Sequence, residues 1–268
     1  MRLKGAVSWS LSLLLLGASI ACSACSSNTE GKEDAGQSPP PSGAVETNVV
    51  KGRVVDSTGK PLAGAQVVAD NQLLYDANVE GVTGADGTYR LELGRAATTW
   101  NVSARFQRQY NGQTYTFDLH PSNPNSFATN EGAIRDFAWR LTGPRAEGGT
   151  YGGMVLFDLT VYVDAEDPNT PLARENVELT LTPEGPLVDG STGAPLTARG
   201  TNSGDGFGLQ DVAIGRYTVT ARYAPQGKPA RPMVLRLNNG DTYASSLTTD
   251  FKTVASTVNR IDLQLKFP

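Results

Sequence analysis

The chain has 268 residues, enough for one large domain or two of ordinary size, and its 29 glycines and 16 prolines fall far short of a fibrous or fully disordered composition. The formal charge of −4 leaves no basic surplus to neutralise phosphates, so nucleic acid is excluded as an expected partner. One histidine and two cysteines are too few for a histidine–cysteine metal site, and we expect neither a metal nor a cofactor.

The N-terminus has the pattern of an export signal. Arg2 and Lys4 form a short basic region, and the apolar stretch that follows is shorter than the roughly 20 residues of a membrane-spanning helix. Residues 1–21 are therefore interpreted as a signal peptide. The boundary Ala18-Ser19-Ile20-Ala21 leads directly into Cys22 and resembles the lipobox of bacterial lipoproteins. This resemblance implies a diacylglycerol thioether on Cys22, which becomes the first residue after cleavage.

Cys25 is the alternative acylation site. Cys22 is preferred because it follows the apolar stretch more closely, and because a cysteine three positions before the cleavage site fits the lipobox poorly. An ordinary secretory signal that leaves both cysteines unmodified is the other interpretation. If Cys22 is acylated, Cys25 is a lone thiol and the folded part contains no disulfide. We then expect a cell-envelope protein, in the outer membrane if the cell has two membranes, because Ser23 rather than an aspartate follows Cys22.

Residues 22–48 are predicted to form a disordered, lipid-anchored tether. They include three consecutive prolines and few large apolar side chains, so they cannot bury enough surface to offset the entropy lost on ordering. A flexible chain of this length spans roughly 25 Å on average. Its expected role is to hold the folded part of the protein clear of the membrane.

The rest of the chain carries one plan twice, in residues 49–141 and 154–268, with a glycine-rich linker at 142–153 that imposes little on their relative orientation. Five motifs recur in the same order. They are 61–67 and 171–177, 84–87 and 203–206, 100–106 and 217–223, 111–115 and 239–243, and 135–141 and 261–267. The second copy has extra residues between Tyr223 and Asn239, which we expect to form a longer loop.

Each copy is predicted to be a β-sandwich, which makes the protein all-β with two tandem antiparallel sandwiches of prealbumin or immunoglobulin type. Apolar and polar residues alternate over 100–107, 114–119 and 261–267, as in strands with one buried face. Asn111-Gly112 suits the type I′ turn of a two-residue hairpin. Residues 247–258 have helical spacing but are rich in threonine and β-branched residues, so we expect an irregular connection with at most one helical turn.

Three segments of the first copy, 50–56, 59–67 and 83–91, resemble the carboxypeptidase regulatory-like, or transthyretin-like, domain. The resemblance covers about forty residues of the first copy and is loose in the second. It implies a prealbumin-like sandwich that serves as an accessory unit. It implies no catalytic residues, and no peptidase domain accompanies the pattern in this chain.

Two features of the sequence raise the question of catalysis or metal binding: His120, and a cluster of oxygen-bearing side chains in one turn. His120 lies in the proline-containing segment Leu119-His120-Pro121-Ser122-Asn123-Pro124, and no G-x-S-x-G motif is present. We therefore interpret it as an ordinary loop histidine rather than part of a catalytic triad. Four oxygen-bearing residues cluster in one turn and suggest a Ca²⁺ site, but their order is not that of an EF-hand and a proline interrupts them. A solvated turn is preferred for this group, which comprises Asp164, Glu166, Asp167 and Asn169.

Two further features concern binding. Trp100 and Trp139 are candidates for stacking on sugars, but they share the apolar side of their strands, so we expect core packing. Arg222, Lys228 and Arg231 flank or occupy the extra loop at a hairpin end, where they would give positive charge suited to an anionic partner. The alternative is that this loop is a solvated insertion without a ligand.

The preferred function is a non-catalytic envelope lipoprotein that binds a protein or polysaccharide partner through its sandwiches. The alternatives are a structural spacer without a specific ligand and a hydrolase with an unrecognised site. An exposed apolar or aromatic patch would favour binding, and a uniformly polar surface would favour a spacer. A deep cleft with converging carboxylates and perturbed pKa values would favour a hydrolase.

Overall fold

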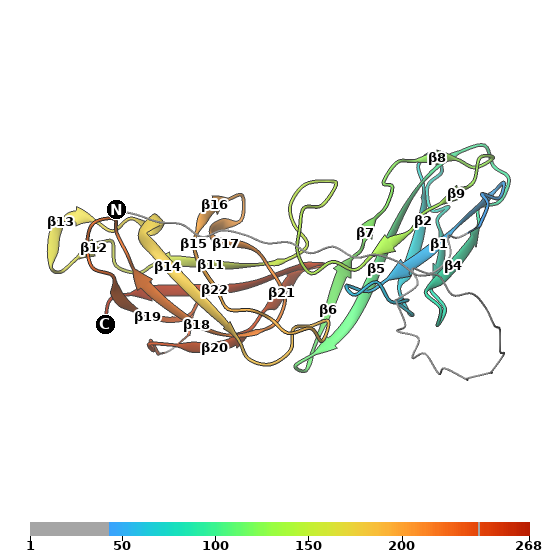
Figure 1. The fold of residues 1–268 in the computed structure, drawn as a ribbon. Coiled ribbons are helices and arrows are strands. Elements are labelled where there is room, and N and C mark those ends of the chain that lie inside the picture. Colours follow the sequence, from blue (N-terminus) through green and yellow to red (C-terminus); the bar gives the residue numbers. More distant parts are fainter. Residues whose placement is uncertain (1–42, 241) are drawn as a thin grey trace, which may run out of the picture. The chain divides into compact units, whose positions relative to one another are not determined.

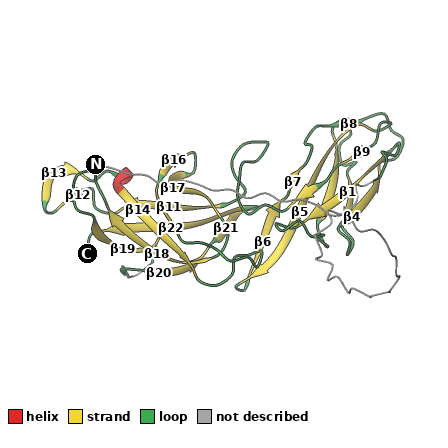
Figure 2. Ribbon diagram, in the orientation of Figure 1, coloured by secondary structure: helices red, strands yellow, loops and turns green. Residues whose placement is uncertain are grey.

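The computed structural model describes residues 43–240 and 242–268, without the side chain of residue 167. The expected signal peptide, Cys22, Cys25 and most of the expected tether therefore lie outside the described residues. Within the described ranges the regular structure is strand, apart from one 3₁₀ turn, η1 at Arg174–Asn176 (Figure 2). No helix in those ranges is long and apolar enough to cross a lipid bilayer.

The first ten strands form what we call the first module, residues 49–138 (Figure 1). Their bounds are Val49–Val55 (β1), Gln66–Asn71 (β2), Val79–Val82 (β3), Thr88–Glu92 (β4), Thr99–Tyr110 (β5), Gln113–Asp118 (β6), His120–Pro121 (β7), Phe127–Ala128 (β8), Ala133–Ile134 (β9) and Phe137–Ala138 (β10). One sheet has the order β3-β2-β5-β6, with β8 also on β5. The other has the order β4-β1-β10-β7, with β9 also on β1.

The remaining strands form the second module, residues 153–266. Their bounds are Gly153–Leu159 (β11), Val163–Asp164 (β12), Asp167–Pro171 (β13), Val177–Pro183 (β14), Leu196–Arg199 (β15), Thr201–Ser203 (β16), Gly206–Val212 (β17), Arg216–Tyr223 (β18), Arg231–Leu237 (β19), Leu247–Asp250 (β20), Lys252–Ala255 (β21) and Val258–Lys266 (β22). The main path is β15-β14-β18-β19-β22-β11-β17-β16, with β20 on β18 and β21 on β22. The strands β12 and β13 form a separate hairpin.

The two modules share one strand path. The order β2-β5-β6 followed by β7-β10-β1-β4 in the first corresponds to β14-β18-β19-β22-β11-β17 in the second. In the second module β19 crosses from one sheet to the other, because Met233 pairs with Ala221 and Leu235 pairs with Leu265. In the first module β6 and β7 share this crossing. The all-β prediction with two tandem sandwiches is confirmed. Most strand pairs are antiparallel, whereas β1 with β9, β1 with β10 and β11 with β22 are parallel.

Several local predictions for the first module are confirmed. In β5 the side chains of Trp100, Val102 and Ala104 are buried, which matches the alternation in the sequence. The β5–β6 turn has positive φ angles at both central residues, 47° at Asn111 and 76° at Gly112, as a type I′ turn requires. The local sequence pattern therefore predicts which side chains of β5 are buried, and it predicts the turn that follows β5.

The side chains of Trp100 and Trp139 lie in the core, as expected. Trp100 and Trp139 are 2% and 3% exposed. The Trp139 ring lies 5.2 Å from the Phe106 ring and 5.1 Å from the Phe117 ring, and Trp100 Nε1 donates to Thr129 Oγ1 at 2.8 Å. Neither indole face is available to stack on a sugar.

Two predictions for the second module are wrong. Residues 231–237 of the expected loop form β19, so only 224–230 connects β18 to β19, and Asn239-Gly240 lies beyond β19. Residues 247–258 contain β20 and β21 and the first residue of β22 rather than an irregular or helical connection. Residues 231–237 form a strand because they pair with β18 at one end and with β22 at the other. Residues 247–258 are rich in threonine and β-branched residues, which favour strands, and pairing with β18 and β22 outweighs their helical spacing.

Hydrogen bonds join the modules directly. Tyr115 is wholly buried, and its hydroxyl donates to the carbonyl oxygen of Phe251 at 2.7 Å. Burial and the charge of Asp250 raise the pKa of Tyr115 to about 12. At the tip of the β5–β6 hairpin, the Tyr110 hydroxyl donates to the Pro186 carbonyl at 2.9 Å and accepts from the Arg216 backbone N–H at 3.0 Å.

Candidate functional site

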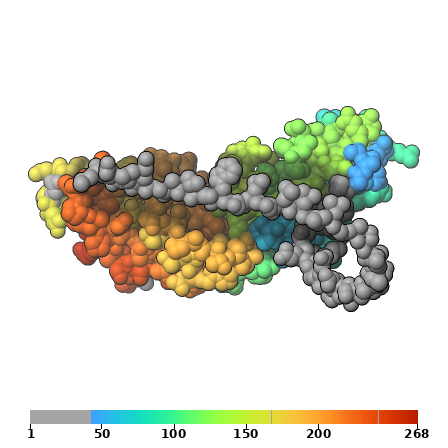
Figure 3. All heavy atoms as spheres, viewed as in Figure 1, coloured from blue at the N-terminus to red at the C-terminus, as the bar shows by residue number. Residues whose placement is uncertain are grey.

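A groove of about 650 Å³ lies at the end of the second module where β18 stops and β19 starts. One wall is the β12–β13 hairpin with the residues that follow it to Asn176. The other wall is the β18–β19 connection, residues 224–230. Both walls lie at the same end of the module (Figure 1), and the yellow hairpin lies beside orange residues in the space-filling view (Figure 3).

Both walls are places where the second module has longer connections than the first. In the first module the chain leaves β1 through a short turn closed by the Asp56 N–H, which donates to the Lys60 carbonyl at 2.8 Å. The corresponding connection after β11 contains the β12–β13 hairpin. Likewise, the two-residue turn between β5 and β6 is replaced by residues 224–230. Both connections that are longer in the second module therefore border the same groove.

Arg231 connects the two walls of the groove. Its guanidinium pairs with the carboxylate of Asp164, and its Nη1 donates to Glu166 Oε2 at 2.6 Å. It also lies over the Phe267 ring, 4.0 Å from the centroid. Hydrogen bonds from Arg231 and from the Glu166 N–H lower the pKa of Asp164, and the charge of Lys228 adds to this effect. Two carboxylates of the cluster considered for Ca²⁺ are thus paired with an arginine.

The structure separates the three cations of the predicted binding end. Lys228 and Arg231 line the groove, whereas Arg222 lies on β18 and pairs with Glu178 of β14. Carboxylates therefore face both arginines and offset much of the positive charge that the sequence suggested. The role of Arg222, Lys228 and Arg231 in partner binding stays a prediction. Because carboxylates offset the arginine charges, the groove does not favour an anionic partner over a neutral one.

The groove also has an apolar part. The Tyr223 ring is buried, and its hydroxyl accepts from the Ala173 N–H at 3.2 Å and from Asn176 Nδ2 at 3.3 Å. The connection 224–230 is fixed at its start, because the Ala224 N–H donates to the Asn176 carbonyl at 2.8 Å. The apolar lining also includes Pro171, Leu172, Ala173, Pro225 and Pro229. Prolines on both walls restrict the backbone, so the groove loses little conformational entropy when it binds a partner.

An exposed aromatic side chain lies next to the groove. Tyr162 is 73% exposed, and its carbonyl accepts from the N–H of Leu172, a lining residue, at 2.9 Å. Its neighbours Val161 and Val163 are also exposed. Sequence reasoning missed Tyr162. The available signal was the run of three consecutive apolar residues, Val161-Tyr162-Val163, in a segment that the sequence predicted to be a turn.

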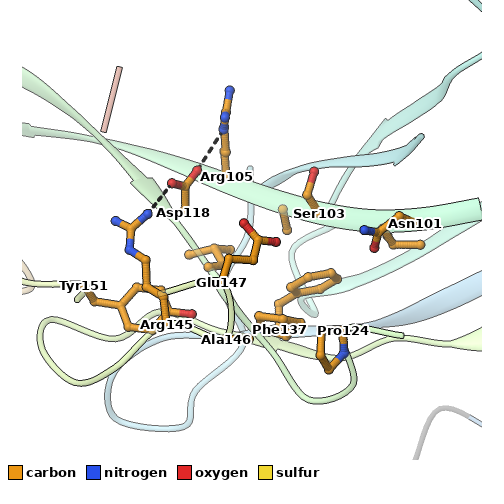
Figure 4. A pocket seen from close by; sticks show the side chains of 14 residues that line it. Asn101, Ser103, Arg105, Asp118, Pro124, Phe137, Arg145, Ala146, Glu147 and Tyr151 are labelled. Carbon is orange, nitrogen blue, oxygen red and sulfur yellow. Dashed lines mark hydrogen bonds and ion pairs between the residues drawn. The ribbon is translucent and has the colours of Figure 1, made fainter. Parts of the chain in front are cut away.

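A second, smaller cavity of about 170 Å³ lies between β5, β6 and the segment 145–151 (Figure 4). Asp118 projects into it and accepts from Arg105 Nε at 2.9 Å, Arg145 Nη1 at 2.7 Å and Thr257 Oγ1 at 2.8 Å. Burial alone would raise the pKa of Asp118, but these hydrogen bonds outweigh it and the pKa is lowered. This cavity is too small for a macromolecule and holds its carboxylate firmly ionised.

No pKa shift among the described carboxyl groups has the direction that favours a general acid. A carboxyl group serves as a general acid more readily when its pKa is raised. Every carboxyl pKa that clearly departs from its ordinary value in the described part is lowered, and these groups belong to Glu46, Asp86, Asp118, Asp164 and Asp189. The described side chains also contain no group of three or more metal-ligating residues arranged around one point.

His120 lies in the short strand β7 rather than in a loop. Its Nδ1 is 3.1 Å from the Tyr151 hydroxyl, and the two rings meet edge to face with centroids 5.8 Å apart. Burial and the charge of Arg140 lower the pKa of His120. The histidine is therefore a packing and hydrogen-bonding residue of the first module, in contact with Tyr151, which lies between the modules.

Comparison with known proteins agrees with the expected family for the first module. The family model of the carboxypeptidase regulatory-like domain matches residues 49–128. The first module is similar to that family, and the matched range ends before the second module. No curated protein matches the chain in sequence.

Solved structures give weak likenesses. The Bacillus anthracis TIE protein is 15% identical with a TM-score of 0.32, over 81% of this chain and 34% of that one, so this chain spans about a third of its length. A C-terminal fragment of the pilus adhesin SpaC from Lactobacillus rhamnosus GG is 14% identical with a TM-score of 0.26, over 81% and 96%. A streptococcal ancillary pilin is 13% identical with a TM-score of 0.25, over 80% and 62%. Such scores carry no functional argument.

Proposed function

We propose that this protein is a non-catalytic, lipid-anchored envelope protein whose second module binds a protein or polysaccharide partner in the groove between the β12–β13 hairpin and residues 224–230. The observation that carries the proposal is the convergence of two lengthened connections on that groove. Longer connections at the end of a rigid sandwich are where binding residues collect. A spacer without a ligand would gain nothing from either of them.

The surface chemistry supports binding. The groove combines apolar side chains with the charges of Asp164, Glu166, Lys228 and Arg231, and the exposed Tyr162 lies at its edge. An exposed apolar and aromatic patch with a polar rim is typical of interaction sites. A volume of about 650 Å³ suits a few residues of an extended polypeptide or a few sugar units.

The anchoring part of the proposal depends on the N-terminal pattern. Acylation of Cys22 would hold the protein in the cell envelope, and in the outer membrane of a cell with two membranes. The β18–β19 connection lies at the opposite end of β18 from Arg216, which contacts the first module. The groove therefore opens on the side of the second module that does not contact the first, where a partner has access.

The test replaces residues 224–230 by Asn-Gly, the turn of the first module, and leaves both strands intact. Immobilised wild-type protein is exposed to detergent-solubilised envelope proteins and, separately, to isolated envelope polysaccharide. We expect the wild type to retain a partner and the replacement to weaken retention at least about tenfold, as loss of a central contact region does.

Gln107→Ala is the control, because Gln107 is exposed on β5 in the first module and does not line the groove. Circular dichroism verifies that both variants keep the wild-type strand content. Equal retention by the wild type and the replacement variant would overturn the groove proposal. Hydrolysis of an envelope substrate by the wild type would overturn the non-catalytic assignment.

A further inference from the structure

The connection between β2 and β3 carries an unusual run of exposed apolar residues. Leu73, Leu74 and Tyr75 are 69%, 49% and 101% exposed. Single exposed apolar residues are common on proteins, but three in succession at a loop tip form a patch that normally has a partner. None of them belongs to the groove of the second module.

The base of this loop is fixed by a buried side chain. Asn71 is 8% exposed, and its Oδ1 accepts from the backbone N–H groups of Leu73 at 3.0 Å and Leu74 at 2.9 Å. The same oxygen accepts from Thr98 Oγ1 at 2.7 Å. The backbone that presents the apolar side chains is therefore held in place by the fold.

A chain of hydrogen bonds places this loop at the end where the polypeptide enters the first module. The Thr129 N–H donates to the Thr98 carbonyl at 3.0 Å, and the Asn48 N–H donates to the Thr129 carbonyl at 3.1 Å. Asn48 directly precedes β1, and Thr98 contacts Asn71 at the base of the loop. In Figure 1 the start of β1 and the connection from β2 lie at the same end of the module.

The number of residues between Cys22 and the first described residue determines how far the start of the first module can lie from a lipid on Cys22. Residues 23–42 separate Cys22 from the first described residue. Such a segment spans at most about 70 Å when extended and roughly 25 Å as a flexible chain. A lipid on Cys22 would therefore keep this end of the first module within reach of the bilayer surface.

We propose that Leu73, Leu74 and Tyr75 insert into the interfacial layer of the lipid bilayer and act as a second membrane contact beside the acyl chains. This inference rests on the proposed anchor at Cys22. Leucine side chains gain by leaving water for the acyl boundary, and tyrosine is favoured at the headgroup level. Asp70 and Asp76 flank the tip, so the surface that fits it is a zwitterionic one.

The inserted loop would orient the first module on the bilayer. An acyl anchor on a flexible chain holds a protein near the membrane but does not orient it. A second contact made by a rigid loop fixes one end of the module toward the lipid. Because the acyl anchor already holds the protein at the membrane, the second contact is effectively intramolecular, so three inserted side chains can provide a stable contact.

The experiment uses the full-length acylated protein reconstituted in phosphatidylcholine–phosphatidylethanolamine vesicles whose acyl chains carry bromine, which quenches tryptophan fluorescence at the acyl boundary. Tyr75→Trp reports on the loop. Tyr162→Trp is the matched control, because Tyr162 is also exposed but lies in the second module. The wild type supplies the background from its own tryptophans. We expect at least about twofold stronger quenching at position 75 than at position 162.

Each outcome is decisive. Loss of quenching on adding Leu73→Ser and Leu74→Ser to Tyr75→Trp supports insertion. Equal quenching at both positions in a protein whose N-terminal peptide carries the lipid by mass spectrometry overturns the loop contact and leaves the anchor intact. A lipid-free N-terminal peptide overturns the anchor and this inference with it. In a further measurement without vesicles, the tryptophan emission of the Tyr75→Trp variant is compared at several protein concentrations. A concentration-dependent shift that the wild type does not show would mean that the patch contacts a second copy of the chain, which overturns the lipid contact.

Discussion

The two modules use the same end of the same sandwich in different ways. In the first module, the turn after β1 and the β5–β6 turn are short, and they contact the second module through Ser57 with Asp189 at 2.6 Å and Tyr110 with Pro186 at 2.9 Å. In the second module, the corresponding connections are long and enclose a groove. The comparison shows that connection length decides whether this end contacts the other module or encloses a groove, while the strand path stays the same.

The largest expected effect tests whether the two cores are equivalent. Trp139 and Leu265 occupy corresponding places and are 3% and 0% exposed. Trp139→Ala should lower the free energy of unfolding by about 3–5 kcal/mol and Leu265→Ala by about 2–5 kcal/mol, because each leaves a cavity. Urea unfolding followed by circular dichroism measures both.

Trp139→Phe is the control for the tryptophan. Trp139 Nε1 has no hydrogen-bond partner within the described part of the chain, so phenylalanine loses packing but no hydrogen bond. We expect a loss smaller than that of Trp139→Ala, because phenylalanine keeps part of the ring packing. A loss as large as that of Trp139→Ala would contradict this expectation.

The next effect concerns the hydrogen bond that joins the two modules through the Tyr115 hydroxyl and the Phe251 carbonyl. Tyr115→Phe removes the donor to the Phe251 carbonyl and leaves that oxygen unpaired in a buried place. The free energy of unfolding should fall by about 1–3 kcal/mol. Tyr217→Phe is the comparison within the second module, since its hydroxyl donates locally to the Ala213 carbonyl at 2.9 Å. If the two modules separate in solution, Tyr115→Phe will have no effect on stability.

A reciprocal exchange of connections tests the comparison directly. Placing the sequence of residues 224–230 between β5 and β6, in place of Asn111-Gly112, removes the Asn111 Nδ2 hydrogen bond to Asp250 Oδ1 at 2.8 Å and crowds the junction. We expect this exchange to cost about 1–2 kcal/mol of stability, whereas Asn-Gly in place of 224–230 costs less than about 1 kcal/mol. Equal costs in thermal unfolding would contradict the division of roles.

The smallest effect is electrostatic. Hydrogen bonds from Lys51 and Arg90 lower the pKa of Glu46 from 4.5 to about 2. A lowered carboxyl pKa stabilises the fold above the unfolded-state pKa, and this contribution is lost as the pH falls from about 4.5 toward 2. NMR titration should show the Glu46 midpoint far below that of an exposed glutamate, and Lys51→Met should raise it. An unchanged midpoint in Lys51→Met would show that the pair does not form in solution.

Sequence pattern predicted the first module better than the second. Alternation in β5 and the Asn111-Gly112 turn depend on neighbouring residues only, so they can be inferred locally. The crossing strand β19 was missed because its residues pair at one end with β18 and at the other with β22. A strand that changes partners partway does not present one steady alternation, and neither a turn motif nor residue spacing identifies it.

The sequence by itself determined the all-β class, the repeated plan, the burial of Trp100 and Trp139, and the place of the long β18–β19 connection. Only the tertiary structure decided how the charges meet, because Arg231 and Asp164 are 67 positions apart and come together through the β12–β13 hairpin. It likewise decided that Leu73, Leu74 and Tyr75 stay exposed although they are apolar. Local pattern records whether a residue suits burial, whereas packing of distant segments determines whether a neighbour is there to cover it.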